Sequence, residues 1–406
     1  MEENFEKDNI KQNNLENNLE IKNISNIETE EPDEKPINKK VNIINFIIIG
    51  VIFIGLLFYM LIVDGIDNII NLLKSVEYKW VFAGFLCLIA HWICEATVLH
   101  IPIKKIYKNQ TFKNSFKVSM IGQLFNNVTP FSTGGQPMQA YEFSKSGKRV
   151  SDCFSAMALK FIVTQTALVT FTLIVMCFQF SFFASLMDNF LWIAITSFIV
   201  NILAIIIVII AGIKKRAITC ITTPIIKILG KIHIIKNVDK TLIKLDESID
   251  NFGNQFKIIK SEKIMILKMF LVAIIQSIAY YSITYMVYRA FGNSGVSFWQ
   301  IIPAQAFLLL IMTFIPTPGS GLGAEGGFLL IFNSIFKQGT INMSILFWRL
   351  YTFYLPIIVG CLFLIPSKKA QRTNRKALTF VLILYFLFVF YVNLFFSKFL
   401  NKGFLK

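Results

Sequence analysis

The sequence predicts an all-α, polytopic integral membrane protein with about seven full transmembrane helices and two shorter re-entrant elements broken by glycine and proline. Of its 406 residues, 55% are hydrophobic and 41 are phenylalanine, an apolar share above that of ordinary soluble domains. Apolar runs of about 20 residues, long enough to cross a hydrocarbon core of roughly 30 Å, recur along the chain. Two further segments are interrupted by glycine and proline and do not fit as simple crossings.

Three parts follow one another along the chain. Residues 1–42 are rich in Asn, Glu and Lys and poor in large apolar side chains, which predicts a disordered cytoplasmic tail. Residues 43–365 form the transmembrane domain, and residues 366–406 are a basic linker with an extra C-terminal helix. The seven predicted spans are 43–63, 80–101, 154–178, 187–212, 264–290, 344–365 and 378–396. We expect no signal peptide, because no apolar run begins within roughly the first 30 residues.

Basic residues predict how the chain is oriented. They gather before the first span, between the second and third, in 214–263 and after the sixth span, whereas 64–79 and 179–188 hold few. Segment 214–263, expected to be a basic cytoplasmic loop or an amphipathic linker, carries eleven Lys or Arg against five acids. Since basic loops stay in the cytoplasm, we expect a multi-pass cell-membrane protein with a cytoplasmic N-terminus and an external C-terminus.

The first broken element contains FNNVTPFSTGGQPMQAY, with basic flanks on both sides. Its amide side chains are tolerated in apolar surroundings only when they have partners, and its prolines and glycines interrupt a helix. We expect a polar cavity wall, although a polar hairpin at the cytoplasmic interface is an alternative. The candidate residues are Asn126, Asn127, Pro130, Gly134, Gly135, Gln136 and Gln139.

The second broken element contains FIPTPGSGLGAEGGF, and both of its ends are predicted to be external. The prolines should end a helix that starts at Phe298, the glycines permit positive φ or close approach, and a new helix should begin near Ala324 with Glu325 in its first turn. Small residues spaced for close helix packing are the alternative. The candidate residues are Pro316, Pro318, Gly319, Gly321, Gly323, Glu325 and Gly326.

Two broken elements that enter from opposite faces are typical of inverted-repeat transporters with a site near the midplane, so an inverted repeat is one interpretation. Ionisable residues within apolar spans add candidates. Arg349 and Lys160 could hold a lipid phosphate or extend to the interface. His91 and Glu95 are four residues apart, hence on one helix face, and a satisfied buried pair is favoured over a metal site.

The two motifs, in this order, resemble the lysylphosphatidylglycerol synthase transmembrane family, the flippase-like region of the multiple peptide resistance factor, over roughly residues 43–365. The resemblance implies movement of aminoacylated or other phosphate-linked lipids between leaflets, with links to lipid metabolism and to resistance against cationic antimicrobial peptides. It places the motif residues named above at the headgroup cavity. The resistance factor continues into a soluble lysine-transferring domain, whereas here a seventh predicted span follows the sixth.

The resemblance therefore favours a lipid translocator or lipid-binding protein over phosphatidylglycerol lysyltransferase activity. The alternative is a lipid-modifying membrane enzyme with Glu95 or Glu325 as general base. The expected partners are an anionic or aminoacylated membrane phospholipid and, as a candidate, a separate lipid synthase; the oligomeric state stays open. We expect no nucleic acid despite a net charge of +16, because the basic residues lie in loops next to spans. The six cysteines include no CxxC pair, and we expect neither a metal nor a cofactor.

Overall fold

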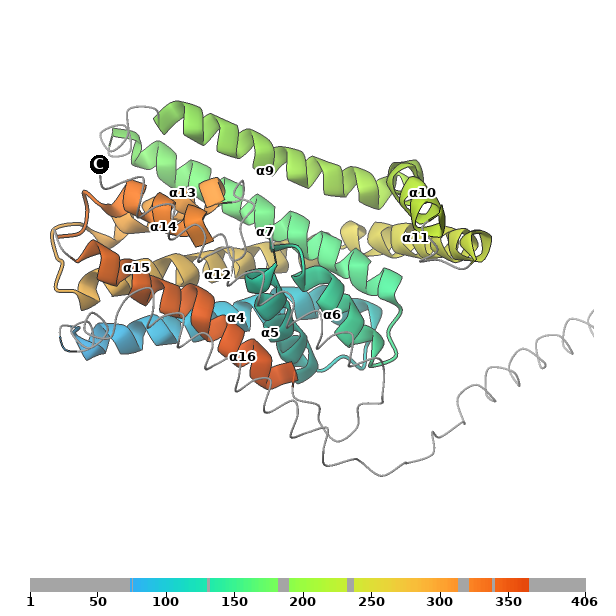
Figure 1. The fold of residues 1–406 in the computed structure, drawn as a ribbon, viewed down its shortest axis with the longest axis horizontal. Helices are drawn as coiled ribbons and strands as arrows, with labels where there is room; N and C mark the ends of the chain where they lie inside the picture. The colour runs from blue at the N-terminus through green and yellow to red at the C-terminus, as the bar shows by residue number, and fades with distance from the viewer. Residues whose placement is uncertain are drawn as a thin grey trace, which may run out of the picture. The chain divides into compact units, whose positions relative to one another are not determined.

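The computed structural model describes residue 74 and residues 76–129, 132–181, 190–231, 237–312, 321–337 and 340–364. Most of them lie in α-helices (Figure 1). Within these ranges, five helices are long and apolar enough to cross a membrane: Tyr78–Ile106, Val150–Phe178, Leu191–Ile213, Lys263–Ala290 and Ile341–Leu364. They confirm five of the predicted spans, with ends that differ by a few residues. The predicted tail and the predicted spans 43–63 and 378–396 lie outside the described residues.

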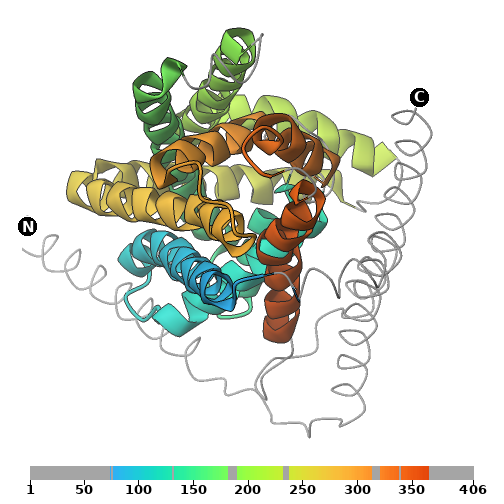
Figure 2. The same ribbon diagram turned by 90° about the vertical axis from the view of Figure 1, so that its left-hand side faces the viewer.

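Helices α4 (Tyr78–Ile106) and α12 (Lys263–Ala290) pack side by side and run antiparallel, as Figure 2 shows from one end. At one end of the pair, the Glu77 N–H donates to the Ala290 carbonyl over 2.9 Å. At the other end, Lys105 pairs with Glu262 at 2.7 Å. Helix α7 (Val150–Phe178) packs against both. These three helices supply the polar groups of the candidate site.

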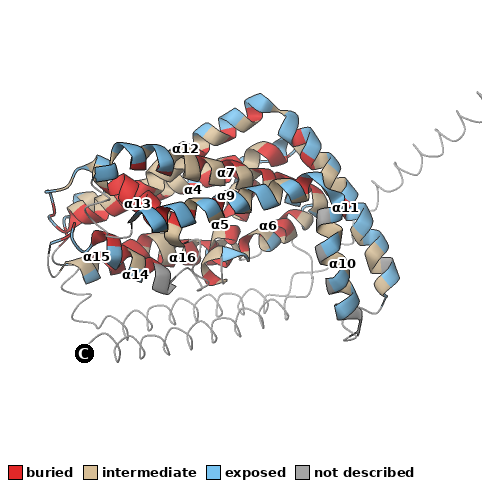
Figure 3. Cartoon of the chain, turned by 90° about the horizontal axis from the view of Figure 1, so that it is seen from above, coloured by how far each residue is buried: buried red, intermediate tan, exposed pale blue. Residues whose placement is uncertain are grey.

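Helix α9 (Phe190–Ile213) packs on α7 and presents an apolar outer face. Leu191, Trp192 and Ile207 are 53%, 73% and 63% exposed, and exposed positions follow α9 along its length in Figure 3. A contiguous apolar face of this kind is costly in water but suits contact with lipid acyl chains.

Helices α5 (Phe112–Val128) and α6 (Gly135–Ser144) form the first broken element. They pack against each other, and α5 also packs on α4 and α16. The element starts just after Tyr107 and returns to Arg149, whose backbone N–H donates to the Tyr107 hydroxyl oxygen over 2.9 Å. It therefore begins and ends at the basic end of α4.

Helices α13 (Phe298–Met312) and α14 (Gly321–Phe332) form the second broken element. Lys337, which follows α14, donates from its backbone N–H to Asn293 Oδ1 over 3.0 Å and from Nζ to the Gly292 carbonyl over 2.9 Å. This element therefore begins and ends at the Ala290 end of α12, opposite the first (Figure 1).

The start of α14 differs from the prediction. The helix begins at Gly321 rather than near Ala324, so Glu325 lies in its second turn instead of its first. Gly321 and Gly323 consequently have helical backbone and do not supply the positive φ that their sequence context suggested. Pro316, Pro318 and Gly319 lie outside the described residues, as does Pro130 of the first element.

The last described span contains α15 (Ile341–Arg349), a π-helical turn η3 (Leu350–Tyr354) and α16 (Leu355–Leu364). Pro356 follows the π-turn, and a proline has no N–H to continue an i→i−4 ladder. The π-turn accommodates this missing donor, because the Leu355 N–H reaches the Leu350 carbonyl instead. Such turns occur often at functional sites, and this one directly follows Arg349.

Segment 214–263 was predicted to be a basic cytoplasmic loop or an amphipathic linker, and the structure describes it over 214–231 and 237–263. It contains α10 (Lys215–Lys231) and α11 (Val238–Ser261). Helix α11 packs on α7, where the Ser155 hydroxyl donates to the Phe252 carbonyl over 2.8 Å. Phe256 also packs against Gly212, where an added Cβ would lie 2.5 Å from the ring. The burial of Phe256 and this close approach hold α11 in place. The high charge of the segment gave no sign of this packing.

Candidate functional site

A buried ion pair lies among the three central helices. Lys160 Nζ on α7 donates to Glu95 Oε1 on α4, and Gln276 Nε2 on α12 donates to Glu95 Oε2 over 2.6 Å. The Lys160 and Glu95 side chains are only 12% and 10% exposed. Lys160 thus does not extend to the interface, and its partner is Glu95, whereas the sequence had suggested a pairing of His91 with Glu95.

The depth of this pair follows from helix geometry. Glu95 stands eleven residues before the end of α4 at Ile106, and Lys160 ten residues after the start of α7 at Val150. At 1.5 Å per residue, each lies about 15 Å from the same end of the two helices. Glu95 and Lys160 therefore stand at matching levels on α4 and α7, which lets them pair.

His91 continues the polar group along α4. Its Nδ1 lies 3.3 Å from the Gln276 backbone carbonyl, and its ring centroid is 4.9 Å from that of Tyr280. Tyr280 of α12 thus extends the cluster beyond His91.

Arg349 and Glu325 form a second ion pair, with 3.4 Å between Arg349 Nε and Glu325 Oε1. The Arg349 side chain is 8% exposed and that of Glu325 is 50% exposed. The guanidinium also lies 5.1 Å from the Phe353 ring centroid, which favours a buried cation. The structure therefore brings together the predicted arginine and the predicted acid of the second broken element. Glu325 is the more exposed partner of the two.

In the first broken element, Asn126 and Thr129 stabilise the break itself. Asn126 Oδ1 accepts the Gly135 N–H over 2.9 Å, and Thr129 Oγ1 accepts the Gly134 N–H over 2.8 Å. They cap the free N–H groups at the start of α6. A Cβ added to Gly135 would lie 2.2 Å from Asn126 Oδ1, so the glycine allows this close approach.

The three other predicted amide residues of this element differ in their surroundings. Gln139 is buried and packs on Gly122, where an added Cβ would lie 2.1 Å from Gln139 Nε2. Gln136 is half-buried. The Asn127 Nδ2 atom is buried and has no hydrogen-bond partner within the described ranges, so this amide retains donor capacity.

In the second broken element, the two glycines after Glu325 have different surroundings. A Cβ on Gly326 would meet nothing within 4 Å, whereas one on Gly327 would lie 2.6 Å from Leu308 Cδ1 of α13. Gly327 thus lets α13 and α14 approach closely, as small residues do between membrane helices. Gly326 leaves open space beside Glu325.

Polar groups at the basic end of α4 join this end to the start of α7. The Tyr107 hydroxyl donates to Asp152 Oδ2 over 2.6 Å, and Arg149 Nε donates to the same oxygen over 3.0 Å. Burial and this hydrogen bond raise the pKa of Tyr107, and burial lowers the pKa of Lys148. These contacts fasten helix ends and lie well away from the Glu95–Lys160 pair.

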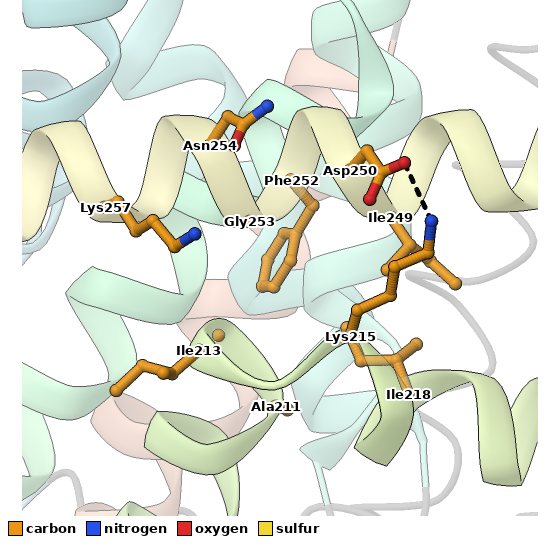
Figure 4. A pocket seen from close by; sticks show the side chains of 11 residues that line it. Ala211, Ile213, Lys215, Ile218, Ile249, Asp250, Phe252, Gly253, Asn254 and Lys257 are labelled. Atoms are coloured by element: carbon orange, nitrogen blue, oxygen red, sulfur yellow. Dashed lines mark hydrogen bonds and ion pairs between the residues drawn. The ribbon is translucent and has the colours of Figure 1, made fainter.

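A shallow pocket occurs elsewhere, where α9, α10 and α11 meet (Figure 4). Asn254, Lys257 and Phe252 line one side of it. Lys215 on the other side pairs with Asp246 and Asp250, each at 2.8 Å. Because Lys215 and Lys257 are both exposed, this pocket lacks the buried charge of the ion-pair site.

Sequence analysis overlooked two members of the site, Gln276 and Tyr280. Both stand in the apolar run 264–290, and a primary amide in such a run needs a partner, so Gln276 carried a usable signal. Tyr280 carried none, since tyrosine is common in membrane helices. Within the described ranges, no group of three His, Cys, Asp or Glu side chains could hold a metal ion.

Comparison with known proteins gives a consistent result. The family model described as "Lysylphosphatidylglycerol synthase TM region" matches residues 46–360. A UPF0104 membrane protein of Methanocaldococcus jannaschii is 26% identical over 314 residues, which cover 75% of this chain and 90% of that protein. A UPF0104 membrane protein of Archaeoglobus fulgidus is 21% identical over 321 residues, which cover 76% of this chain and 93% of that protein.

Proposed function

Since the chain belongs to the lysylphosphatidylglycerol synthase transmembrane family, we propose that this multi-pass membrane protein binds an anionic, phosphate-linked lipid and moves it between leaflets. An aminoacylated phospholipid is one candidate, supplied by a separate lipid synthase. Such a role would link the protein to lipid metabolism and to resistance against cationic peptides.

The observation that carries this proposal is the presence of two buried cations within spanning helices. Lys160 pairs with Glu95, and Arg349 pairs with Glu325. Each cation is neutralised by an acid from another helix, so the group carries no net charge and tolerates its low-dielectric surroundings. A lipid phosphate could exchange with either carboxylate, and Arg349 offers the bidentate geometry that phosphate prefers.

The two broken elements support a path for the headgroup. Each begins and ends at one end of the central helices, and the two elements do so at opposite ends. We propose that both are re-entrant, that the basic end of α4 faces the cytoplasm, and that the C-terminus is external. The headgroup would pass the polar side chains between the elements while the acyl chains remain in the bilayer.

Leaflet exchange of a fluorescent phosphatidylglycerol in proteoliposomes tests this function. Wild-type protein should accelerate exchange over empty liposomes. Arg349→Lys should retain part of the activity, because a point charge still attracts phosphate, and Arg349→Gln should lose most of it. Glu325→Gln should change which lipid is preferred without abolishing all exchange.

Arg289 provides a matched control, because it is also an arginine on a spanning helix but stacks on Trp80 with 4.8 Å to the ring centroid. Arg289→Gln should leave exchange near the wild-type rate. Wild-type exchange no faster than that of empty liposomes would contradict the proposal. A new lipid species that disappears in Glu325→Gln would instead indicate an enzyme.

A further inference from the structure

The amide of Gln276 can serve Glu95 in two ways. Its Nε2 donates to Glu95 Oε2 over 2.6 Å, which suits an ionised carboxylate. Its Oε1 is buried and has no hydrogen-bond partner among the residues that the structure describes, and an unmet buried acceptor is costly. Rotation of the amide by half a turn would bring this oxygen to Glu95. There it could accept a hydrogen bond only if the carboxyl group were protonated.

From this geometry we propose that Glu95 is a proton-binding group, and that its protonation releases Lys160 to bind the phosphate of the translocated lipid. The inference rests on the proposed function and adds the ion to which lipid binding is coupled. Resting Lys160 is held by Glu95, so the same ammonium cannot be fully available to a phosphate. Protonation removes this competition.

The charges balance in both states. With Glu95 ionised, the carboxylate and the Lys160 ammonium sum to zero. With a proton from water on Glu95 and one phosphodiester anion on Lys160, the sum is again zero. Uncompensated charge is very costly at a buried site within spanning helices. Protonated Glu95 without the lipid, and bound lipid with ionised Glu95, are therefore disfavoured. Uptake of one proton consequently accompanies binding of one anionic headgroup.

The surroundings of Glu95 leave few other groups to take up this proton. The titratable groups whose charges act on it are Lys160 of α7 and His91 of α4. The titratable group of α12 nearest the cluster is Tyr280, which faces His91. Among the charges near the packed helices, Lys117 of α5 pairs with Glu142, and Glu262, just after α11, pairs with Lys105.

Isothermal titration calorimetry of the purified full-length protein in neutral detergent tests the inference. The probe is short-chain phosphatidylglycerol, a phosphodiester whose own charge stays constant between about pH 5.5 and 8.5. Titrations in two buffers of different ionisation enthalpy count the protons taken up. We expect one proton per lipid bound near neutral pH, and a Kd that rises tenfold per pH unit once free Glu95 is ionised.

Glu95→Gln should bind the probe with no proton uptake and with an affinity independent of pH. Glu142→Gln is the control, because Glu142 is also buried and lysine-paired but lies outside the five spanning helices; it should keep the wild-type proton count. Proton uptake that persists in Glu95→Gln would assign the proton to His91 and overturn the inference.

The wild-type protein alone also decides the matter, so the test does not depend on the folding of a variant. Binding of phosphatidylglycerol with no proton uptake would overturn the coupling and leave the proposed function standing. Absence of binding at every pH, with no leaflet exchange, would overturn both.

Discussion

Gly135→Ala should destabilise the first broken element, because the new methyl group would stand where the cap of α6 lies. A Cβ at this position would be 2.2 Å from Asn126 Oδ1, the atom that accepts the Gly135 N–H over 2.9 Å. The Asn126 side chain or the backbone must therefore move, and the hydrogen bond must break or distort.

The expected magnitude combines three effects. Overpacking costs about 1–3 kcal/mol, and loss of the cap costs about 1 kcal/mol. Replacing glycine by alanine in a helix returns up to about 1 kcal/mol. The net loss of unfolding free energy should be about 1–3 kcal/mol, measured by detergent-induced unfolding in mixed micelles.

Two further variants make the prediction specific. Asn126→Ala alone should cost about 1 kcal/mol through the lost cap. Asn126→Ala/Gly135→Ala should cost no more than that, because the methyl group then has room, so the two single effects should exceed the double effect by about 1–3 kcal/mol. Gly326→Ala is the control, since its Cβ would meet nothing within 4 Å. Additive single effects, or a Gly135→Ala protein as stable as Gly326→Ala, would refute the reasoning.

Two other predictions concern orientation and charge. On a Cys-free background, a single cysteine at the exposed position Asn342 should react with an impermeant thiol reagent from outside, whereas one at the exposed position Asn237 should not; external labelling at 237 would reverse the proposed orientation. Lys160→Gln should lower the unfolding free energy by about 3 kcal/mol, because it leaves Glu95 buried without its cation. Lys215→Gln, at an exposed pair, should have no measurable effect on the unfolding free energy. Equal effects in the two variants would show that burial does not control the stability contributed by these pairs.

From the amino-acid sequence alone we predicted the five helices that are long and apolar enough to cross a membrane, and the places where the chain is broken. Helix length and apolarity are local properties, and five predicted spans are helices here. The sequence also identified Glu95, Lys160 and Arg349, because an ionisable residue in an apolar run is costly wherever its partner lies. The predicted breaks fall between α5 and α6 and between α13 and α14, although the start of α14 was misplaced because glycine is compatible with both a turn and a helix.

Which of these groups meet follows from the packing of the helices. Lys160 and Glu95 are 65 residues apart in the sequence, and Gln276 and Glu95 are 181 residues apart. Their contacts depend on the rotation and relative height of separate helices, and the sequence of one segment contains neither quantity. The same holds for Asn126, a predicted cavity residue, whose Oδ1 caps α6. A polar side chain in a membrane must find some partner, but whether that partner is a lipid, a backbone N–H or another side chain depends on how the helices pack.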